Sequence, residues 1–389
     1  MSYCVIWHWC PGLYEANTDI SITTSTTNVP RIIFLLNGCA MIIYQTLDNM
    51  DGKQARKTGT SSPLGLLFDH GCDAMNLILG SANWIAAMAL IPGNVGDVVL
   101  LGNNNDNTII NIQSKSLLSA FFGGDAILAY LLIFCPMIAF YVSTWEQYYT
   151  GTLILPPFNG PSEGLIMGAS LSFVSYFWGP MFWQETSIVD IVIVKLFDYG
   201  ISSDSNAILQ YFTPMQGRVR NMDLVVLAAV VSLVQEVVLK TGSVIRKFGM
   251  QSLRTMLPHL LLVSSTYMIL RNDSTIFLRC PRTMMHLISG LFTEQTTQLM
   301  LDHMVEEEYE VRKRWCLLPQ LVLAVGMTAG LSISVESLDA FLLVYTTGLW
   351  VYLGFKIRVY IHEICDVLGI YCFDIIAPHP NNGTTKKNN

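Results

Sequence analysis

The feature that most constrains this chain is a series of long apolar runs. Several are near the roughly 20 residues that a helix needs to cross a bilayer. The nine runs cover residues 31–47, 64–92, 116–145, 164–183, 223–240, 255–271, 284–301, 316–335 and 338–356. Only 13% of the 389 residues are charged, whereas ordinary globular domains contain about 25%. The sequence therefore predicts an all-α polytopic membrane protein with a bundle of about nine to ten transmembrane helices.

The N-terminal residues predict a tenth span that is incomplete. Residues 3–10 are apolar and aromatic but too short to cross a bilayer. We expect them to be the end of a first helix that is truncated. The first fourteen residues lack the basic start and the small-residue cleavage site of a signal peptide.

Basic residues in short loops predict the orientation, because Lys and Arg gather on the cytoplasmic side. Lys53, Arg56 and Lys57 place the 48–62 loop there. Counting spans forward places residues 246–247, residues 312–314 and the C-terminal tail on the same side. The 272–283 segment falls on the other side although it contains two arginines, so it is either a short luminal turn or the sign of a misplaced boundary.

Three regions follow from this pattern. Residues 1–185 are predicted to form the catalytic core, 186–356 further transmembrane helices, and 357–389 an amphipathic and polar cytoplasmic tail. Lys386 and Lys387 occupy the fourth and third places from the carboxyl end, which resembles a dilysine signal for retrieval to the endoplasmic reticulum. The net charge of −7 and the scattered basic residues argue against nucleic-acid binding.

Four aspartates near the first predicted cytoplasmic loop carry the chemistry. Asp48 and Asp51 are three residues apart, and Asp69 and Asp73 are four apart, so each pair shares one helix face. Carboxylates near hydrocarbon are costly unless they are paired or bound to a metal. Opposed carboxylate pairs suit Mg²⁺ or Mn²⁺, which also bind substrate phosphates. The sequence therefore predicts a metal site.

Small and basic residues accompany these aspartates. Gly52 and Ala55 allow a backbone or a pyrophosphate to come close, and Gly65 permits tight helix contact. Arg56 can hold phosphate oxygens in a fork. Pro63 stands where the next helix is expected to start.

The pattern Asp48-x-x-Asp51-Gly52-x-x-Ala55-Arg56, eight residues, Gly65-x-x-x-Asp69-x-x-x-Asp73 resembles the complete signature of the class-I CDP-alcohol phosphotransferases. The surrounding residues 44–48 and 68–73, which include Tyr44 and His70, resemble the eukaryotic choline and ethanolamine phosphotransferase branch. Residues 145–153 and 159–164 are similar to the same branch.

The resemblance implies a mechanism for phospholipid synthesis. Two Mg²⁺ or Mn²⁺ ions would be held by the four aspartates, and His70 would take the proton from the hydroxyl of diacylglycerol. That hydroxyl would attack the β-phosphate of CDP-ethanolamine or CDP-choline and expel CMP. Histidine suits the base role because its unperturbed pKa is about 6.5. The expected substrate-binding residues are Arg56, Gly52, Ala55, Gly65, Tyr44 and, for the ammonium group of the alcohol, Glu146.

The resemblance also implies a cellular setting. We expect a multi-pass homodimer in the bilayer of the endoplasmic reticulum or Golgi, with the active site at the cytoplasmic face. Relatives have an Ala-Pro-Asn stretch in their first span, and the corresponding place lies before Met1. We therefore expect a shortened first span.

The sequence leaves three alternatives open. The same catalytic core could serve another head group, such as inositol, or the chain could be a truncated, inactive paralogue that acts as a dimer partner. Intramembrane carboxylates could also serve ion binding in a transporter or channel. Glu236, inside an apolar run, is a functional candidate because ionisable residues at such places are usually functional.

Overall fold

The computed structural model describes residues 30–90, 98–99, 110–111, 116–152, 161–186, 188–191, 217–370 and 372. This part of the chain contains eleven α-helices, short 3₁₀ turns and one antiparallel pair of two-residue strands, β1 (Val98–Val99) and β2 (Ile110–Asn111). The helical prediction is confirmed, and the strand pair is a small departure from it. The residues before 30 and the tail after 372 lie outside the described part, and with them the expected half-span and the dilysine pair.

Each of the nine apolar runs overlaps at least one described helix. The helices are α2 (Arg31–Thr58), α3 (Pro63–Ala87), α4 (Leu117–Phe122), α5 (Asp125–Thr150), α6 (Pro161–Trp178), α9 (Asn221–Phe248), α10 (Leu257–Asn272), α12 (Pro281–Met304), α13 (Leu318–Thr328) and α14 (Val335–Leu368). The third run is split into α4 and α5, because Gly123 and Gly124 adopt positive φ angles that a helix does not allow.

Five of the described helices are long and apolar enough to cross a bilayer: α2, α5, α9, α10 together with its preceding turn, and α14. This finding supports a polytopic membrane protein, and the count of nine to ten spans stays a prediction. α12 is less apolar because polar side chains such as Glu294 and Thr296 are buried against other helices rather than facing lipid. α9 shows the opposite pattern. It exposes an apolar stripe of Leu224, Leu227, Val231, Val234 and Val238.

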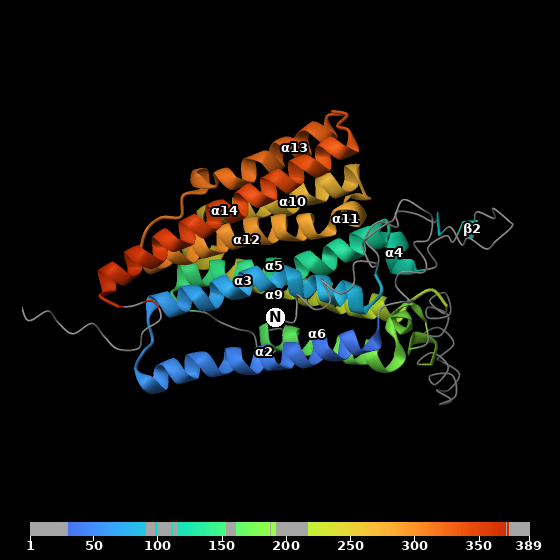
Figure 1. Cartoon of the computed structure of the whole chain (residues 1–389), viewed down its shortest axis with the longest axis horizontal. Helices are drawn as coiled ribbons and strands as arrows, with labels where there is room; N and C mark the ends of the chain where they lie inside the picture. The colour runs from blue at the N-terminus through green and yellow to red at the C-terminus, as the bar shows by residue number, and fades with distance from the viewer. Residues whose placement is uncertain are drawn as a thin grey trace, which may run out of the picture.

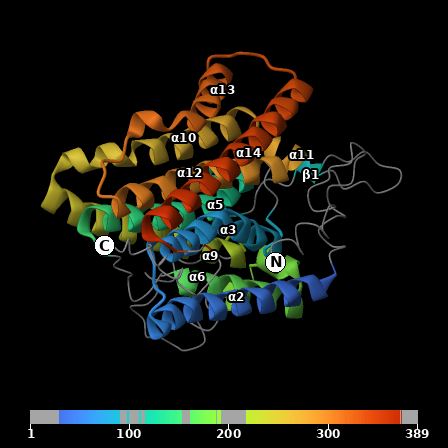
Figure 2. The ribbon, with the colours of Figure 1, turned by 60° about the vertical axis from the view of Figure 1, so that its left-hand side comes forward.

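Most of the long helices run side by side along the long axis of the molecule (Figure 1). α2 packs on α6 at one side, α3 and α5 lie in the middle, and α12 packs on α3 and on α14. α9 lies against α5, and α10 pairs with α13. The turned view shows the same order, with α2 and α6 at one edge and α13 at the other (Figure 2). α3 and α5 are therefore enclosed by neighbours on several sides.

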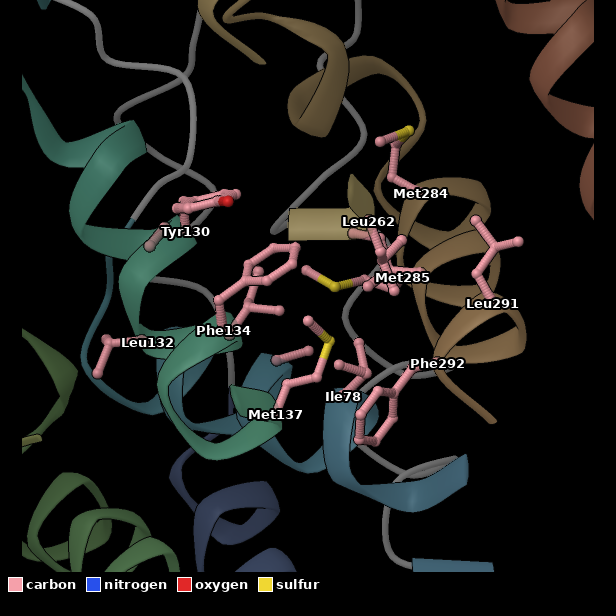
Figure 3. Close-up of a cluster of buried hydrophobic side chains, with 14 of the residues drawn as sticks. Ile78, Tyr130, Leu132, Phe134, Met137, Leu262, Met284, Met285, Leu291 and Phe292 are labelled. Atoms are coloured by element: carbon pink, nitrogen blue, oxygen red, sulfur yellow. The ribbon is translucent and has the colours of Figure 1, made fainter. Parts of the chain in front are cut away.

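The main apolar core lies between α3, α5, α10 and α12. Figure 3 shows side chains from these helices pointing toward one another, among them Ile78, Phe134, Met137, Leu262 and Phe292. All five are fully buried or nearly so. Because lipid is about as apolar as these side chains, they stabilise the helix contacts mainly through close packing. The core fixes α3, which carries half of the acidic signature.

Two glycines let helices approach closely. An added Cβ at Gly38 of α2 would lie 2.6 Å from the Phe173 ring of α6, and one at Gly168 of α6 would overlap the indole of Trp84 on α3. At both positions the neighbouring ring lies too close for a Cβ atom to fit. Because glycine has no side chain, α6 can pack closely against α2 and α3 at these positions.

The 272–283 segment contains a short helix, α11 (Ile276–Arg279). The guanidinium of Arg279 lies 2.8 Å from a carboxylate oxygen of Asp273 and 3.1 Å from one of Asp339 on α14. Because this arginine is neutralised by two aspartates, it carries little weight in a count of positive charge. Its presence in a segment predicted to lie on the non-cytoplasmic side is therefore a weaker objection to the predicted orientation.

The predicted amphipathic segment after Lys356 does not start a helix of its own. Residues 356–368 continue α14 without a break and end at Gly369, whose φ of 63° closes the helix in the left-handed conformation. Their placement at the membrane surface stays a prediction.

Candidate functional site

A helical hairpin positions the acidic residues. α2 ends at Gly59, whose φ of 70° allows the amides of Gly59 and Thr60 to bond the carbonyls of Arg56 and Ala55. α3 begins four residues later at Pro63. Its N-cap, Ser62, accepts a hydrogen bond from the Gly65 amide at 3.1 Å. The chain therefore reverses within four residues.

This reversal sets the two acidic pairs opposite each other. Asp51 lies seven positions before the end of α2 at Thr58, and Asp69 lies six positions after the start of α3 at Pro63. Because the rise per residue is about 1.5 Å in both helices, the two residues reach similar heights. The eight residues between Arg56 and Gly65 in the signature thus form the turn that brings the two aspartates to the same level.

Three of the four aspartates meet. Carboxylate oxygens of Asp48, Asp51 and Asp69 all lie within 4.8 Å of one another. Asp48 and Asp69 are half-buried and Asp51 is exposed. Such a cluster of oxygen donors fits a hard divalent cation, since the like charges otherwise repel at this separation.

Asp73 lies one turn further along α3 and has a different partner. The hydroxyl of Tyr44 on α2 donates a hydrogen bond to Asp73 Oδ1 at 2.6 Å. Tyr44, expected to bind substrate, thus holds the fourth aspartate from the opposite helix. The two predicted aspartate pairs therefore come together, with three of the aspartates in the cluster and Asp73 beside it.

The other signature residues lie on the same stretch of α2. Arg56 is exposed, and its guanidinium folds back over Gly52, where an added Cβ would be 3.4 Å from Arg56 Nη1. The Gly52 amide donates a hydrogen bond to the carboxylate of Asp51. The guanidinium of Arg56 thus lies beside Gly52, the residue that follows Asp51 in the signature.

A cavity of about 330 Å³ opens beside the aspartates. Asp48, Asp69 and His70 line it at this end, and His70 contacts the edge of the Phe140 ring with centroids 6.3 Å apart. Most of the remaining wall comes from α3, α5 and α6 and is rich in apolar and aromatic side chains. Among these are Leu77, Trp84, Cys135, Pro136, Ala139, Phe140, Leu165 and Met167.

α9 supplies a further wall of the cavity through Ala229, Leu233 and Glu236. These three residues lie four and three positions apart and so share one helix face. α9 lies outside the predicted 1–185 core. The cavity therefore extends across the boundary predicted from the sequence.

Two residues that line the cavity, Ser143 and Glu236, belong to a buried charged network. Lys240 Nζ is 3.2 Å from Glu146 Oε2 and 3.5 Å from Glu236 Oε1. The Ser143 hydroxyl donates to Glu236 at 3.0 Å and accepts from Lys240 at 3.0 Å. Glu146 was predicted to contact the ammonium of the alcohol, and the structure places its carboxylate against Lys240.

Sequence reasoning missed Lys240 and Ser143. The available signal was spacing: Glu236 and Lys240 are four residues apart, and Ser143 and Glu146 are three apart, so each pair shares a helix face. What the sequence did not reveal is that α5 and α9 pack together and bring the pairs into contact.

Comparison with known proteins identifies the family. Choline/ethanolaminephosphotransferase 1 of Arabidopsis thaliana is 30% identical over 371 residues, which cover 89% of this chain and 79% of the relative. The chain belongs to the CDP-alcohol phosphatidyltransferase class-I family. The resemblance drawn from the signature is confirmed.

Other members of the CDP-alcohol phosphatidyltransferase class-I family match over similar lengths. Uncharacterized CDP-alcohol phosphatidyltransferase class-I family protein 3 of Dictyostelium discoideum is 27% identical over 360 residues, 90% of this chain and 81% of the relative. Ethanolaminephosphotransferase 1 of Homo sapiens is 25% identical over 368 residues, 93% of this chain and 78% of the relative. No family model matches the chain.

Proposed function

We propose that this chain transfers phosphoethanolamine or phosphocholine from CDP-ethanolamine or CDP-choline to diacylglycerol, releasing CMP. The observation that carries the proposal is the acidic cluster of Asp48, Asp51 and Asp69 beside His70 at one end of a largely apolar cavity. A charged nucleotide and an apolar lipid can meet at such a place. The names of the Arabidopsis and human relatives point to the same substrates.

Mg²⁺ or Mn²⁺ ions would be held by Asp48, Asp51 and Asp69, with Asp73 beside them. Bound there, two such ions supply the charge that stabilises the attacking and leaving oxygens of an in-line displacement. Arg56, whose guanidinium lies over Gly52 of the same helix, would bind the pyrophosphate. Tyr44 holds Asp73 in position through its hydrogen bond.

His70 acts as the general base in this proposal. It takes the proton of the diacylglycerol hydroxyl while the oxygen forms a bond to the β-phosphorus of the CDP-alcohol. The bond between that phosphorus and the bridging oxygen breaks, and CMP leaves with the electron pair. The apolar wall around Phe140 and Leu77 suits the lipid that brings the hydroxyl.

The remaining expectations form part of the proposal. The enzyme would be a homodimer in the endoplasmic reticulum or Golgi membrane, with the aspartates at the cytoplasmic face. Family membership favours the transferase class over a transporter or channel. Inositol as head group and an inactive paralogue are the alternatives that the experiment must separate.

Product analysis tests this function. The purified full-length chain is incubated with Mg²⁺ and either diacylglycerol plus each CDP-alcohol or CDP-diacylglycerol plus inositol, and lipid products are identified by mass spectrometry. We expect phosphatidylethanolamine or phosphatidylcholine. Phosphatidylinositol alone would select the other head group, and no product from any pair would support the inactive paralogue.

A further inference from the structure

We propose that Glu236 is the counter-charge for the ammonium group of the CDP-alcohol, so that the cavity contains a cation subsite on α9. This inference rests on the proposed function, because it assigns the part of the same cavity that distinguishes an amino alcohol from a neutral one. Glu236 is only 6% exposed, yet it lines the cavity. It completes the face of α9 that begins with Ala229 and Leu233.

Charge favours a cation at this place. Glu236 and Glu146 share one ammonium, that of Lys240, so the three side chains have a formal charge of minus one. Ser143 holds Glu236 through a hydrogen bond of 3.0 Å. A carboxylate fixed in this way inside a low-dielectric wall interacts strongly with a cation that enters the cavity.

The position matches the length of the substrate. Phe140 contacts His70, and Ser143 follows Phe140 by three residues on the same face of α5. Ser143 and its partner Glu236 therefore lie about one helical turn, roughly 5 Å, along α5 from that contact. In an ethanolamine or choline phosphate, one oxygen and two carbons separate phosphorus from nitrogen. Asp48, Asp69 and Glu236 line the same cavity, so a substrate whose phosphate lies at the acidic cluster would extend its ammonium toward Glu236.

Aromatic residues complete the subsite. Phe140, which contacts His70, and Tyr44, which contacts Asp73, line the cavity at this end. Ring faces attract ammonium groups, including quaternary ones that cannot donate a hydrogen bond. The arrangement accepts either head group, since the carboxylate supplies charge and the rings supply an apolar surface. Glu146 does not line the cavity and forms an ion pair with Lys240 at 3.2 Å.

Binding measurements test the subsite without requiring turnover. Calorimetric titration in Mg²⁺ without diacylglycerol compares CDP-choline with its neutral carbon isostere, CDP-3,3-dimethylbutanol. We expect the wild-type chain to bind CDP-choline at least about tenfold more tightly. Glu236→Gln should bring the ratio close to one, and this change leaves the Lys240–Glu146 pair in place.

Glu294→Gln is the matched control. Glu294 is also a buried carboxylate, paired with Arg314 and Lys356, but it belongs to a different network on α12. We expect it to keep the wild-type ratio. Glu236→Asp keeps the charge and should give an intermediate ratio, which provides a second variant if the amide form does not fold.

Equal affinities of the wild-type chain for the two ligands, or an unchanged ratio in Glu236→Gln, would overturn the subsite. The outcome is separate from that of the proposed function. A chain that discriminates between the ligands but releases no CMP has the subsite and lacks the activity. A chain that releases CMP without discriminating has the activity and lacks the subsite.

Discussion

At the scale of single residues, Asp69 joins the two halves of the acidic site, because it is the α3 member of the cluster with Asp48 and Asp51. Asp69→Asn removes a charged metal ligand with almost no change of shape. We expect turnover to fall by at least about 100-fold with the thermal stability retained. Asp366→Asn, at an exposed position near the end of α14, is the control and should keep full activity. Normal turnover in Asp69→Asn would remove this residue as a ligand.

His70 is expected to act through its proton. His70→Gln keeps a polar side chain in the cavity but cannot accept the proton, and general-base catalysis is worth about 10²–10⁴-fold. We predict that kcat falls in this range while the KM for the CDP-alcohol changes little, since the nucleotide is bound by the aspartates and Arg56. Steady-state kinetics with varied CDP-alcohol provide the check. A raised KM with normal kcat would assign His70 to binding instead.

The residue types of the site could be predicted from the sequence because their spacing is local. The signature from Asp48 to Asp73 lies on one hairpin, and the structure brings three of its aspartates together as the helix faces suggested. The hydrogen bond from Tyr44 to Asp73 and the contact of Lys240 with Glu146 were beyond sequence reasoning. Both depend on how separate helices are rotated against each other.

At the scale of elements, glycine sets how closely α6 approaches α3. Gly168→Ala places a methyl group against the indole of Trp84, so either the ring or α6 must move. We expect a loss of about 1–3 kcal/mol in stability, the usual cost of overpacking. Gly348→Ala on α14 has nothing within 4 Å of its added methyl and should be neutral or slightly stabilising. Thermal unfolding of both variants in detergent tests this difference. Equal melting temperatures would contradict the close packing of α6.

The turn between α10 and α12 makes a pH-dependent contribution to stability. Burial acts to raise the pKa of Asp273, but hydrogen bonds from Arg279 and Thr275 and the charge of Arg279 lower it below its ordinary value. A carboxyl group whose pKa is lowered by folding stabilises the protein above its unfolded pKa of about 3.9, and this contribution is lost as the pH falls through the folded value.

Arg279→Met should therefore lower the melting temperature at pH 6 and have a smaller effect near pH 3, because the contribution of the ion pair declines as the pH falls below the unfolded pKa toward the lowered folded pKa of Asp273. Arg271→Met, which changes an exposed arginine near the end of α10, is the control and should show no such dependence. A loss in Arg279→Met that is the same at both pH values would show that the ion pair with Asp273 contributes nothing.

The positions of the helices could be predicted because apolar runs report burial or lipid exposure directly. The break between α4 and α5 was missed, since Gly123 and Gly124 interrupt a helix without interrupting the apolar run. The sequence did not predict why α12 contains polar residues such as Glu294. In the structure Arg314 and Lys356 each lie 2.8 Å from that carboxylate.

At the scale of the whole molecule, the bundle brings a polar end and an apolar interior into one cavity. The aspartates come from the hairpin of α2 and α3, the apolar wall comes mainly from α3, α5 and α6, and α9 adds Glu236. This arrangement suits a reaction between a water-soluble nucleotide and a membrane lipid. α9 thus lines the same cavity as the hairpin, although the sequence placed it in a separate region.

Release of CMP tests the central claim most directly. The purified full-length chain is supplied with Mg²⁺, diacylglycerol and either CDP-ethanolamine or CDP-choline, and free CMP is measured over time with and without a chelator. We expect CMP release with at least one of the two substrates, dependent on diacylglycerol and abolished by the chelator and by Asp69→Asn. Absence of CMP from both substrates, or release that continues without divalent metal, would contradict it.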